Sequence, residues 1–419
     1  MERFAALLRG RTFRSLAERN FRLFLGGHGV SVIGTWVQRV AQDWLVYSLT
    51  GSGVALGVSL ALQFGPMLLF GLWGGVLVDR VNRFRLIVVT QAVSGVLAAA
   101  LGVLTLTGVV ELWMVYALTC ALGAVTVLDN PARHAFLAEI VGDVDYVNAQ
   151  SLNSAVQNAG RLVGPAIAGL VIAGFGVGLT FVLNAVSFAG VLAGLAAMDR
   201  TRLRPVPPIG RAPGQVREGV RYVAARPELL LVLLMVLVVA LFGQNFRIVL
   251  PLLASEEFRA GPDGYAYLMT AMGAGAVLGA LVTASRRTVG ARSVLLSCTG
   301  FGLVNLTAAV VPSIGLAYAA MVLVGFANIS FNSLARTVLQ TRSDRAMHGR
   351  VMALHSLLFF GTIPVGGPFT GWLCEAFGAR SGLAVAGVSA LLVALVLHPV
   401  VRRLRSCPGP TRSEPDPAA

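Results

Sequence analysis

Long runs of apolar residues dominate the chain, and short clusters of charged residues separate them. Residues 54–78, 86–110, 112–128 and 351–374 contain no Asp, Glu, Lys or Arg. A helix needs about 20 consecutive apolar residues to cross the hydrocarbon core of a bilayer. Each of these runs therefore predicts a membrane-spanning helix.

Twelve predominantly apolar runs of this length follow one another along the sequence. The uncharged stretch 293–335 is long enough for two spans, and we divide it at Pro312–Gly315 because proline and glycine favour a turn. The predicted spans are 21–49, 54–78, 86–108, 111–130, 150–173, 176–198, 228–253, 263–285, 293–311, 315–337, 351–374 and 381–401.

A polar segment with seven arginines and the sequence Pro205–Pro208 divides the twelve spans into two sets of six. The expected organisation is an N-terminal segment 1–20, a six-helix bundle 21–198, a linker 199–227, a second six-helix bundle 228–401 and a disordered tail 402–419.

A weak repeat relates the two sets of helices. Residues 152–154 match residues 354–356 at an offset of 202, and Gly164 matches Gly366 at the same offset. Parallel six-helix repeats are typical of transporters whose substrate path runs between the halves. The alternative is coincidence, since Gly-Pro pairs are common in membrane helices. We predict an all-α membrane protein with two pseudo-symmetric six-helix bundles.

Composition supports lipid as the solvent. Only 12% of the 419 residues are charged, and the mean hydropathy is +0.76, whereas soluble domains contain about 25% charged residues. The net charge of +14 raises the question of nucleic acid binding. The distribution of these charges along the chain instead indicates how the protein is oriented in a membrane.

The 33 basic residues are all arginines, and alternate loops together with the adjoining span ends, beginning with the N-terminus, hold 28 of them. The other loops hold Arg259 and Arg380, and Arg39, Arg161 and Arg247 fall inside predicted spans. Because cytoplasmic loops carry the excess of basic residues, we expect both termini in the cytoplasm of a bacterial inner membrane. Lipid, rather than nucleic acid, is then the partner of the basic loops.

Several kinds of chemistry have no residues to support them. A Walker A loop and a Schiff base both need lysine, which this sequence lacks. The four cysteines show no metal-binding spacing, and the five histidines are scattered. We expect no enzyme activity, no cofactor, no metal site and no disulfide.

The loop between the second and third spans reads Gly75-Val76-Leu77-Val78-Asp79-Arg80-Val81-Asn82-Arg83-Phe84-Arg85. Glycine allows close helix packing, Asp79 is placed to cap or pair, and Asn82 tolerates a left-handed turn. The sequence resembles motif A of the major facilitator superfamily, with Asn82 in place of the usual glycine. The resemblance implies gating roles for Gly75, Asp79, Arg80 and Arg83; the alternative is a merely basic turn.

The fifth span contains Gly160-Arg161-Leu162-Val163-Gly164-Pro165-Ala166-Ile167-Ala168-Gly169. Gly160 and Gly164 lie on one helix face, and Pro165 removes a backbone hydrogen bond. This stretch resembles motif C of drug:proton antiporters within that superfamily, which implies export; the alternative is ordinary helix packing. Residues 130–133 and 148–156 further resemble the branch that includes the enterobactin exporter and macrolide and siderophore effluxers.

Asp43 is the only carboxylate well inside a predicted span, and Arg39 lies four residues before it on the same helix face. An ionisable group at membrane depth usually faces water or a partner. We interpret Asp43 as a candidate proton-coupling site, with Arg39 stabilising its charged form. A structural ion pair between helices is the alternative.

Other polar residues within the spans are candidates for lining a substrate cavity: Gln42, Asn153, Asn158, Arg161, Asn184, Arg247, Asn332 and His355. Arg161 either attracts an anionic substrate group or holds a helix pair through backbone carbonyls. His355 is either a proton sensor or a hydrogen-bonded structural histidine.

These features predict a monomeric secondary transporter that exports a drug-like molecule, macrolide or siderophore by alternating access in exchange for protons. The alternatives are an importer or uniporter on the same fold, a membrane enzyme or lipid scramblase, and a non-transporting membrane partner. Motif C argues against import, and buried arginines argue against a purely structural bundle.

Overall fold

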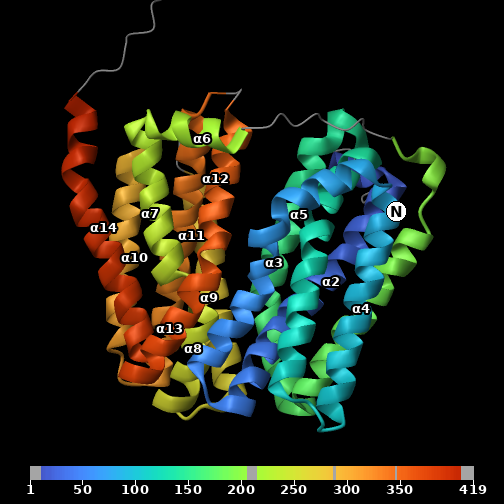
Figure 1. Ribbon diagram of the computed structural model, residues 1–419, viewed down its shortest axis with the longest axis horizontal. Coiled ribbons are helices and arrows are strands. Elements are labelled where there is room, and N and C mark those ends of the chain that lie inside the picture. The colour runs from blue at the N-terminus through green and yellow to red at the C-terminus, as the bar shows by residue number, and fades with distance from the viewer. Residues whose placement is uncertain (1–10, 205–214, 286–288, 345–346, 407–419) are drawn as a thin grey trace, which may run out of the picture.

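The computed structural model describes residues 11–204, 215–285, 289–344 and 347–406, and this part of the chain is helical without strands. Figure 1 shows two groups of upright helices side by side. The first group consists of η1 (Arg11–Ala17), α2 (Arg19–Thr50), α3 (Gly53–Arg80), α4 (Arg83–Leu106) and α5 (Leu112–Ala196), and η2 (Arg200–Arg202) follows it.

The second group begins after the linker and follows the same plan. Its elements are α6 (Gln215–Ala224), α7 (Pro227–Gly243), α8 (Phe246–Leu252), the π-helical turn η3 (Leu253–Glu257), α9 (Gly261–Ala284), α10 (Ala291–Ala309), α11 (Ile314–Arg342), α12 (His348–Gly361), α13 (Ile363–Phe377) and α14 (Arg380–Ser406). The N-terminal group and this C-terminal group are called the first and second halves below.

The prediction of twelve spans is confirmed. In the described residues, nine helices are long and apolar enough to cross a membrane. One of these, 144–196, contains two spans because the chain reverses at Gly176, and α2 and α10 supply the other two. Helix α5 therefore holds three spans, divided at Gly142 and Gly176. Both glycines have positive φ values, 70° and 80°, which residues with a Cβ rarely adopt.

The predicted end of the fourth span, at residue 130, is wrong. The helix passes through Pro131 and continues to the turn at Gly142, and the fifth span begins before residue 150. Charged residues end the lipid-embedded part of a helix, but they do not end the helix itself. The linker also contains a helix, α6, which packs on α12 and α7 and was not predicted.

The two ends of the molecule contain different connecting segments. At the top of Figure 1 lie α6, the beginning of the linker and the turn at Gly142, and we call this the linker end. The opposite end contains Gly51, Gly108, Gly176, Gly261 and Gly378, each with positive φ at a turn between spans. The predicted tail 402–419 and segment 1–20 lie partly outside the described residues.

Large apolar side chains cover the outside of the molecule. Trp73, Trp113 and Leu395 are 68%, 63% and 70% exposed. An apolar exterior of this kind would associate in water, whereas lipid tails solvate it without cost. The exterior therefore agrees with the membrane-spanning assignment.

Candidate functional site

The two halves meet most closely where α3 of the first half packs against α13 of the second. Gly53 lies against the backbone of Gly371, and Gly57 lies against Gly367 and Pro368. A Cβ at Gly57 would come within 2.6 Å of the Gly367 carbonyl oxygen, so there is no room for a side chain. These small residues bring the two halves into backbone contact near the opposite end.

A carboxylate from the second half caps the beginning of α3. The Ser52 hydroxyl and the Val54 backbone N–H both donate hydrogen bonds to Glu375 Oε1, at 2.5 and 3.1 Å. A negative charge at a helix N-terminus is favourable because the first backbone N–H groups have no helical partner. This contact adds a polar link to the glycine contact between α3 and α13.

Further toward the middle of the membrane, Asp43 joins the two halves through an ion pair. Arg247 of α8 donates from Nε and Nη2 to the two carboxylate oxygens, each at 2.7 Å. Tyr265 of α9 donates its hydroxyl to Asp43 Oδ2 at 2.8 Å, and Arg247 Nη1 donates to Gln63 Oε1 of α3 at 2.7 Å. Asp43, Gln63, Arg247 and Tyr265 are called the cross-half cluster below.

The cluster is almost dry. The side chains of Asp43 and Arg247 are 3% and 14% exposed. A buried ion pair of good geometry persists only because each charge satisfies the other, and removing one partner of a buried pair typically costs about 3–5 kcal/mol in soluble proteins. The cluster is therefore sensitive to any change in the charge of Asp43.

The expected pairing of Asp43 with Arg39 does not form as a direct contact. Spacing of four residues puts both on one face of α2, but Asp43 bonds to Arg247 of the other half instead. Arg39 Nε is buried without a hydrogen-bond partner. The pairing depends on how the halves meet, which helical spacing cannot reveal.

A cavity of about 500 Å³ lies between the halves, beside the cross-half cluster. Gln63 and Arg247 form part of its wall, and it extends along the first half to His28, Asn130 and Arg133. Close to Arg247, the seventh span is interrupted at Gln244 and Asn245, between α7 and α8. Interrupted helices beside a central cavity are typical of transporter binding sites.

Trp36 of α2 lies in the cavity wall with two guanidinium groups near its ring. The Arg39 Cζ is 4.7 Å from the ring centroid, and the Arg161 Cζ is 5.3 Å from it. In the described part of the chain, neither arginine has an ion pair or hydrogen bond. Trp36, Arg39 and Arg161 are called the indole–guanidinium site below.

The structure divides the other predicted cavity residues into two groups. Gln42, Asn158, Arg161, Asn184 and Arg247 line the cavity. Gln42 donates to Thr119 and Asn184 donates to Gln38, so both also bridge helices.

Asn153, Asn332 and His355 are not among the lining residues. Asn332 donates to Asn328 on its own helix. His355 stacks on Phe359, with ring centroids 6.1 Å apart, and neither ring nitrogen has a hydrogen-bond partner in the described residues. A hydrogen-bonded structural role and a sensing role for His355 both stay predictions.

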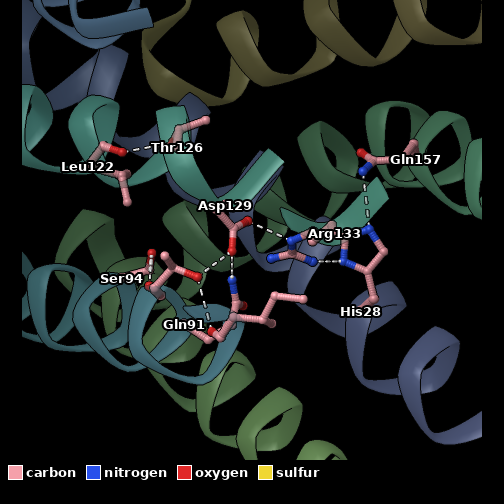
Figure 2. A network of polar contacts seen from close by, with 10 residues as sticks. His28, Gln91, Ser94, Leu122, Thr126, Asp129, Arg133 and Gln157 are labelled. Carbon is pink, nitrogen blue, oxygen red and sulfur yellow. Dashed lines mark hydrogen bonds and ion pairs between the residues drawn. The ribbon is translucent and has the colours of Figure 1, made fainter. Parts of the chain in front are cut away.

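A second polar network lies within the first half and is shown in Figure 2. Asp129 accepts hydrogen bonds from Thr90 and Gln91 at 2.6 and 2.8 Å, and it pairs with Arg133 at 2.6 Å. Arg133 also contacts His28 Nδ1, and Gln157 lies 3.1 Å from His28 Nε2. The network ties α2, α4 and two spans of α5 into one unit and neutralises the charges of Asp129 and Arg133.

The stretch that resembles motif A lies at the linker end. Arg83 pairs with Glu139 at 2.6 Å, Arg80 is exposed and Gly75 is buried. Asp79 lies on α3, and its side chain is outside the described part. The expected left-handed conformation of Asn82 is wrong: its φ is −66°, and its side chain caps α4 by accepting from the Arg85 N–H.

The stretch that resembles motif C packs against α2. Gly160 lies against Val32, and Gly164 lies against Trp36. Pro165 stays helical, because the non-helical residues in α5 are Gly142 and Gly176, and Gly169 faces Ala266 of the second half. Gly164 has a direct consequence for the site, since it lets α2 approach closely enough to place Trp36 beside Arg161.

Comparison with known proteins decides the family. Residues 11–408 match the family described as transmembrane secretion effector. This chain belongs to that family, within the major facilitator superfamily. Family membership confirms the resemblance drawn from the sequence and makes the protein a transporter of the major facilitator type.

Several relatives within the superfamily span nearly the whole chain. The staphyloferrin A transporter of Staphylococcus aureus is 22% identical over 388 residues, which is 92% of this chain and 97% of that one. The multidrug efflux pump Tap of Mycolicibacterium fortuitum is 28% identical and covers 87% and 91%. The enterobactin exporter EntS of Shigella boydii is 27% identical and covers 93% and 94%.

The fold is also that of solved transporters. A bacterial homologue of the lysosomal transporter Spinster, in an inward-facing and unoccupied conformation, aligns with a TM-score of 0.73 at 15% identity, covering 96% of this chain and all of that one. At this identity the likeness shows the fold alone.

Sequence reasoning missed Trp36, Gln63, Tyr265 and the phenylalanines Phe64 and Phe360. Gln63 had a detectable signal, because it is the one amide in the apolar run 54–78. The aromatic residues had none, because an aromatic side chain in an apolar span usually faces lipid or a neighbouring helix.

Proposed function

We propose that this transporter exports an amphipathic small molecule, such as a siderophore, macrolide or drug, across the bacterial inner membrane in exchange for protons. The observation that carries the proposal is the bidentate ion pair between Asp43 and Arg247, which joins the two halves between the cavity and the opposite end. The direction of transport is supported by the likeness to an enterobactin exporter and a multidrug efflux pump.

The orientation follows from charge. The loops at the linker end carry most of the arginines, and basic residues favour the cytoplasm. We therefore place the linker end in the cytoplasm, with the cavity extending toward it and the glycine contact of α3 and α13 closing the outer side. A single chain encloses the cavity, which supports a monomer.

Alternating access then involves the cross-half cluster directly. Closure of the outer side brings Arg247 onto Asp43, and this contact requires a charged carboxylate. When the outer side opens, Asp43 separates from Arg247 and is exposed to external water, from which it takes a proton. The protonated carboxyl returns with the halves to the inward-facing form, releases its proton through the cavity toward the cytoplasm and then pairs again with Arg247, so each cycle moves one proton inward while the substrate moves outward.

The motif A stretch would control the cytoplasmic side in the same cycle. Arg83 and Glu139 form an ion pair that fixes the end of α4 against α5 at the linker end, and Gly75, Asp79 and Arg80 lie on the adjoining end of α3. We propose that these residues act as the cytoplasmic gate.

Flux in vesicles tests the proposal. Proteoliposomes loaded with enterobactin, erythromycin or a catechol carboxylate are given an imposed pH gradient of either sign, and the movement of each compound is measured. Transport that follows the gradient in the antiport direction is expected for at least one compound. Movement with the proton, or movement independent of the gradient, would show an importer or a uniporter instead.

A further inference from the structure

The cavity carries an excess of positive charge in its described lining. Two of its arginines are neutralised, Arg133 by Asp129 and Arg247 by Asp43. Arg39 and Arg161 have no carboxylate partner among the described residues. Two positive charges therefore remain on one wall of the cavity, and both belong to the first half.

The contacts that Arg39 and Arg161 do make are weak compared with the cost of holding them there. A cation near an indole ring gains less free energy than a charged residue at the centre of a membrane helix costs. Arg39 also interacts electrostatically with two like charges, Arg247 and Arg161, and with one opposite charge, Asp43, which already pairs with Arg247. Structural support alone does not explain two guanidinium groups in this position.

The geometry presents the two groups together. Trp36 lies within cation–π distance of both, and the contact of Gly164 with Trp36 fixes the indole against the fifth span. Arg161 is exposed and Arg39 is half-buried, both in the wall of the cavity, and in the described residues neither guanidinium group donates a hydrogen bond. Their N–H groups are thus available to oxygen atoms of a molecule in the cavity.

Another part of the cavity wall is aromatic. Phe64 of α3 stacks on Phe360 of α12 at 6.0 Å and 15°, and Phe359 contacts Phe360 edge to face at 5.1 Å. Phe360 is 39% exposed. These rings offer an apolar surface but no donor or acceptor, so they suit the ring system of a ligand rather than its charged group.

We propose that the indole–guanidinium site binds a carboxylate of the substrate, and that Phe64, Phe359 and Phe360 receive an aromatic or apolar body joined to it. The substrate class is then the aromatic organic anion. The inference rests on the proposed function only in taking the bound molecule as the cargo, because binding itself needs neither a gradient nor a direction of transport.

Two dyes with the same three-ring frame and opposite charge test the site. Fluorescein is an anion with a free carboxylate, and rhodamine 123 has the same ring frame with its carboxyl group blocked as a methyl ester, so it is a cation at neutral pH. Binding of each to the purified full-length protein in nanodiscs is measured by fluorescence anisotropy. The wild type is expected to bind fluorescein at least about tenfold more tightly than rhodamine 123, since charge-assisted hydrogen bonds to a carboxylate are stronger than neutral ones.

Single variants locate the binding. Arg161→Gln and Arg39→Gln are each expected to weaken fluorescein binding by about tenfold, and Arg161→Lys is expected to keep part of it. Arg292→Gln is the matched control, because Arg292 is an exposed arginine at the beginning of α10, away from the cavity lining. Elution as a single species and an unchanged Tm show that each variant is folded.

Three results would overturn the inference: no fluorescein binding by the wild type, equal binding of both dyes, or equal binding of fluorescein by Arg161→Gln, Arg39→Gln and Arg292→Gln. The outcome is separate from that of the flux experiment. Charge-selective binding without gradient-driven flux would contradict proton antiport but support the anion site. Gradient-driven flux without charge-selective binding would support proton antiport but contradict the anion site.

Discussion

Arg39 and Arg247 occupy corresponding places in the two halves, yet their surroundings are opposite. Each lies on the first span of its half, and they are 208 residues apart (247 minus 39). Arg247 is held by both oxygens of Asp43 and by Gln63, whereas Arg39 lies beside the ring of Trp36 and has no hydrogen bond or ion pair in the described residues. In this pseudo-symmetric fold, Arg247 is therefore paired with a carboxylate, whereas Arg39 faces the cavity without one.

This difference in surroundings indicates that the two arginines have different functions. The paired arginine connects the halves, so its contacts change when the halves move. The unpaired arginine stays within the first half beside Arg161, so it can meet a ligand without breaking a protein contact. The predictions below test this separation and are ordered from the largest expected effect to the smallest.

Asp43→Asn should have the largest effect. An amide cannot form a bidentate ion pair with Arg247 or exchange a proton at ordinary pH, so gradient-driven transport should fall by about a hundredfold or more, which corresponds to about 2.7 kcal/mol. The measurement is flux of the best-transported compound under an imposed pH gradient. Fluorescein binding should change little, because Arg39 and Arg161 remain. Full gradient-driven export by this variant would remove the coupling role of Asp43.

Gly57→Val should open the contact between α3 and α13 that closes the outer side. Its side chain would strike the backbone of Gly367 and Pro368, so the outer side should close poorly and transport should fall by about tenfold, or about 1.4 kcal/mol. Gly65→Val on the same helix is the control, because a Cβ there meets nothing within 4 Å. Equal loss in the two variants would mean that helix propensity, and not the contact between halves, explains the effect.

Arg83→Gln should lower stability without affecting the outer side. Its partner Glu139 is only 13% exposed, so loss of the pair should cost about 2 kcal/mol and lower Tm by about 5 °C. Thermal unfolding followed by size-exclusion chromatography measures the change. A variant with unchanged Tm would show that this ion pair contributes nothing to the first half.

Asp344→Asn should have the smallest effect, because its ion pair with Arg226 lies on the surface at the linker end. Hydrogen bonds from Arg226 and Tyr222 hold the pKa of Asp344 below its usual value of 3.8. A lowered carboxyl pKa adds stability above about pH 4, and this is lost as the pH falls through the lowered pKa. Hydrogen exchange near residue 226 should be less than about threefold faster in the variant at pH 7, and the difference from the wild type should disappear as the pH falls through the lowered pKa of Asp344. A difference that persists in acid would contradict the assignment.

Much of the fold could be predicted because apolar run length alone determines a membrane span. The turns were less predictable: the sequence around Asn130 and Pro131 looks like a helix end, and only the φ value of Gly142 shows where the chain reverses. Helix α6 had a usable signal in the spacing of Val216, Val220 and Val223.

The sequence identified which charged residues lie within the spans, but not which of them pair with one another. Charges inside apolar spans marked Arg39, Asp43, Arg161 and Arg247. Which arginine meets Asp43 depends on the packing of two halves separated by about 200 residues, and the sequence spacing favoured the wrong neighbour, Arg39. The role of Gly164 beside Trp36 was equally hidden, because a small residue shows where helices can approach but not what approaches.

The distance between the halves at the outer side tests the central claim most directly. Spin labels at Leu49 and Phe377, which are 41% and 70% exposed at the opposite end, report that distance by pulsed electron paramagnetic resonance in a cysteine-free background. Arg247→Gln should shift the distribution toward longer distances, and Arg39→Gln should leave it as in the wild type. If both variants shift it equally, or neither does, the ion pair between Asp43 and Arg247 does not hold the outer side closed.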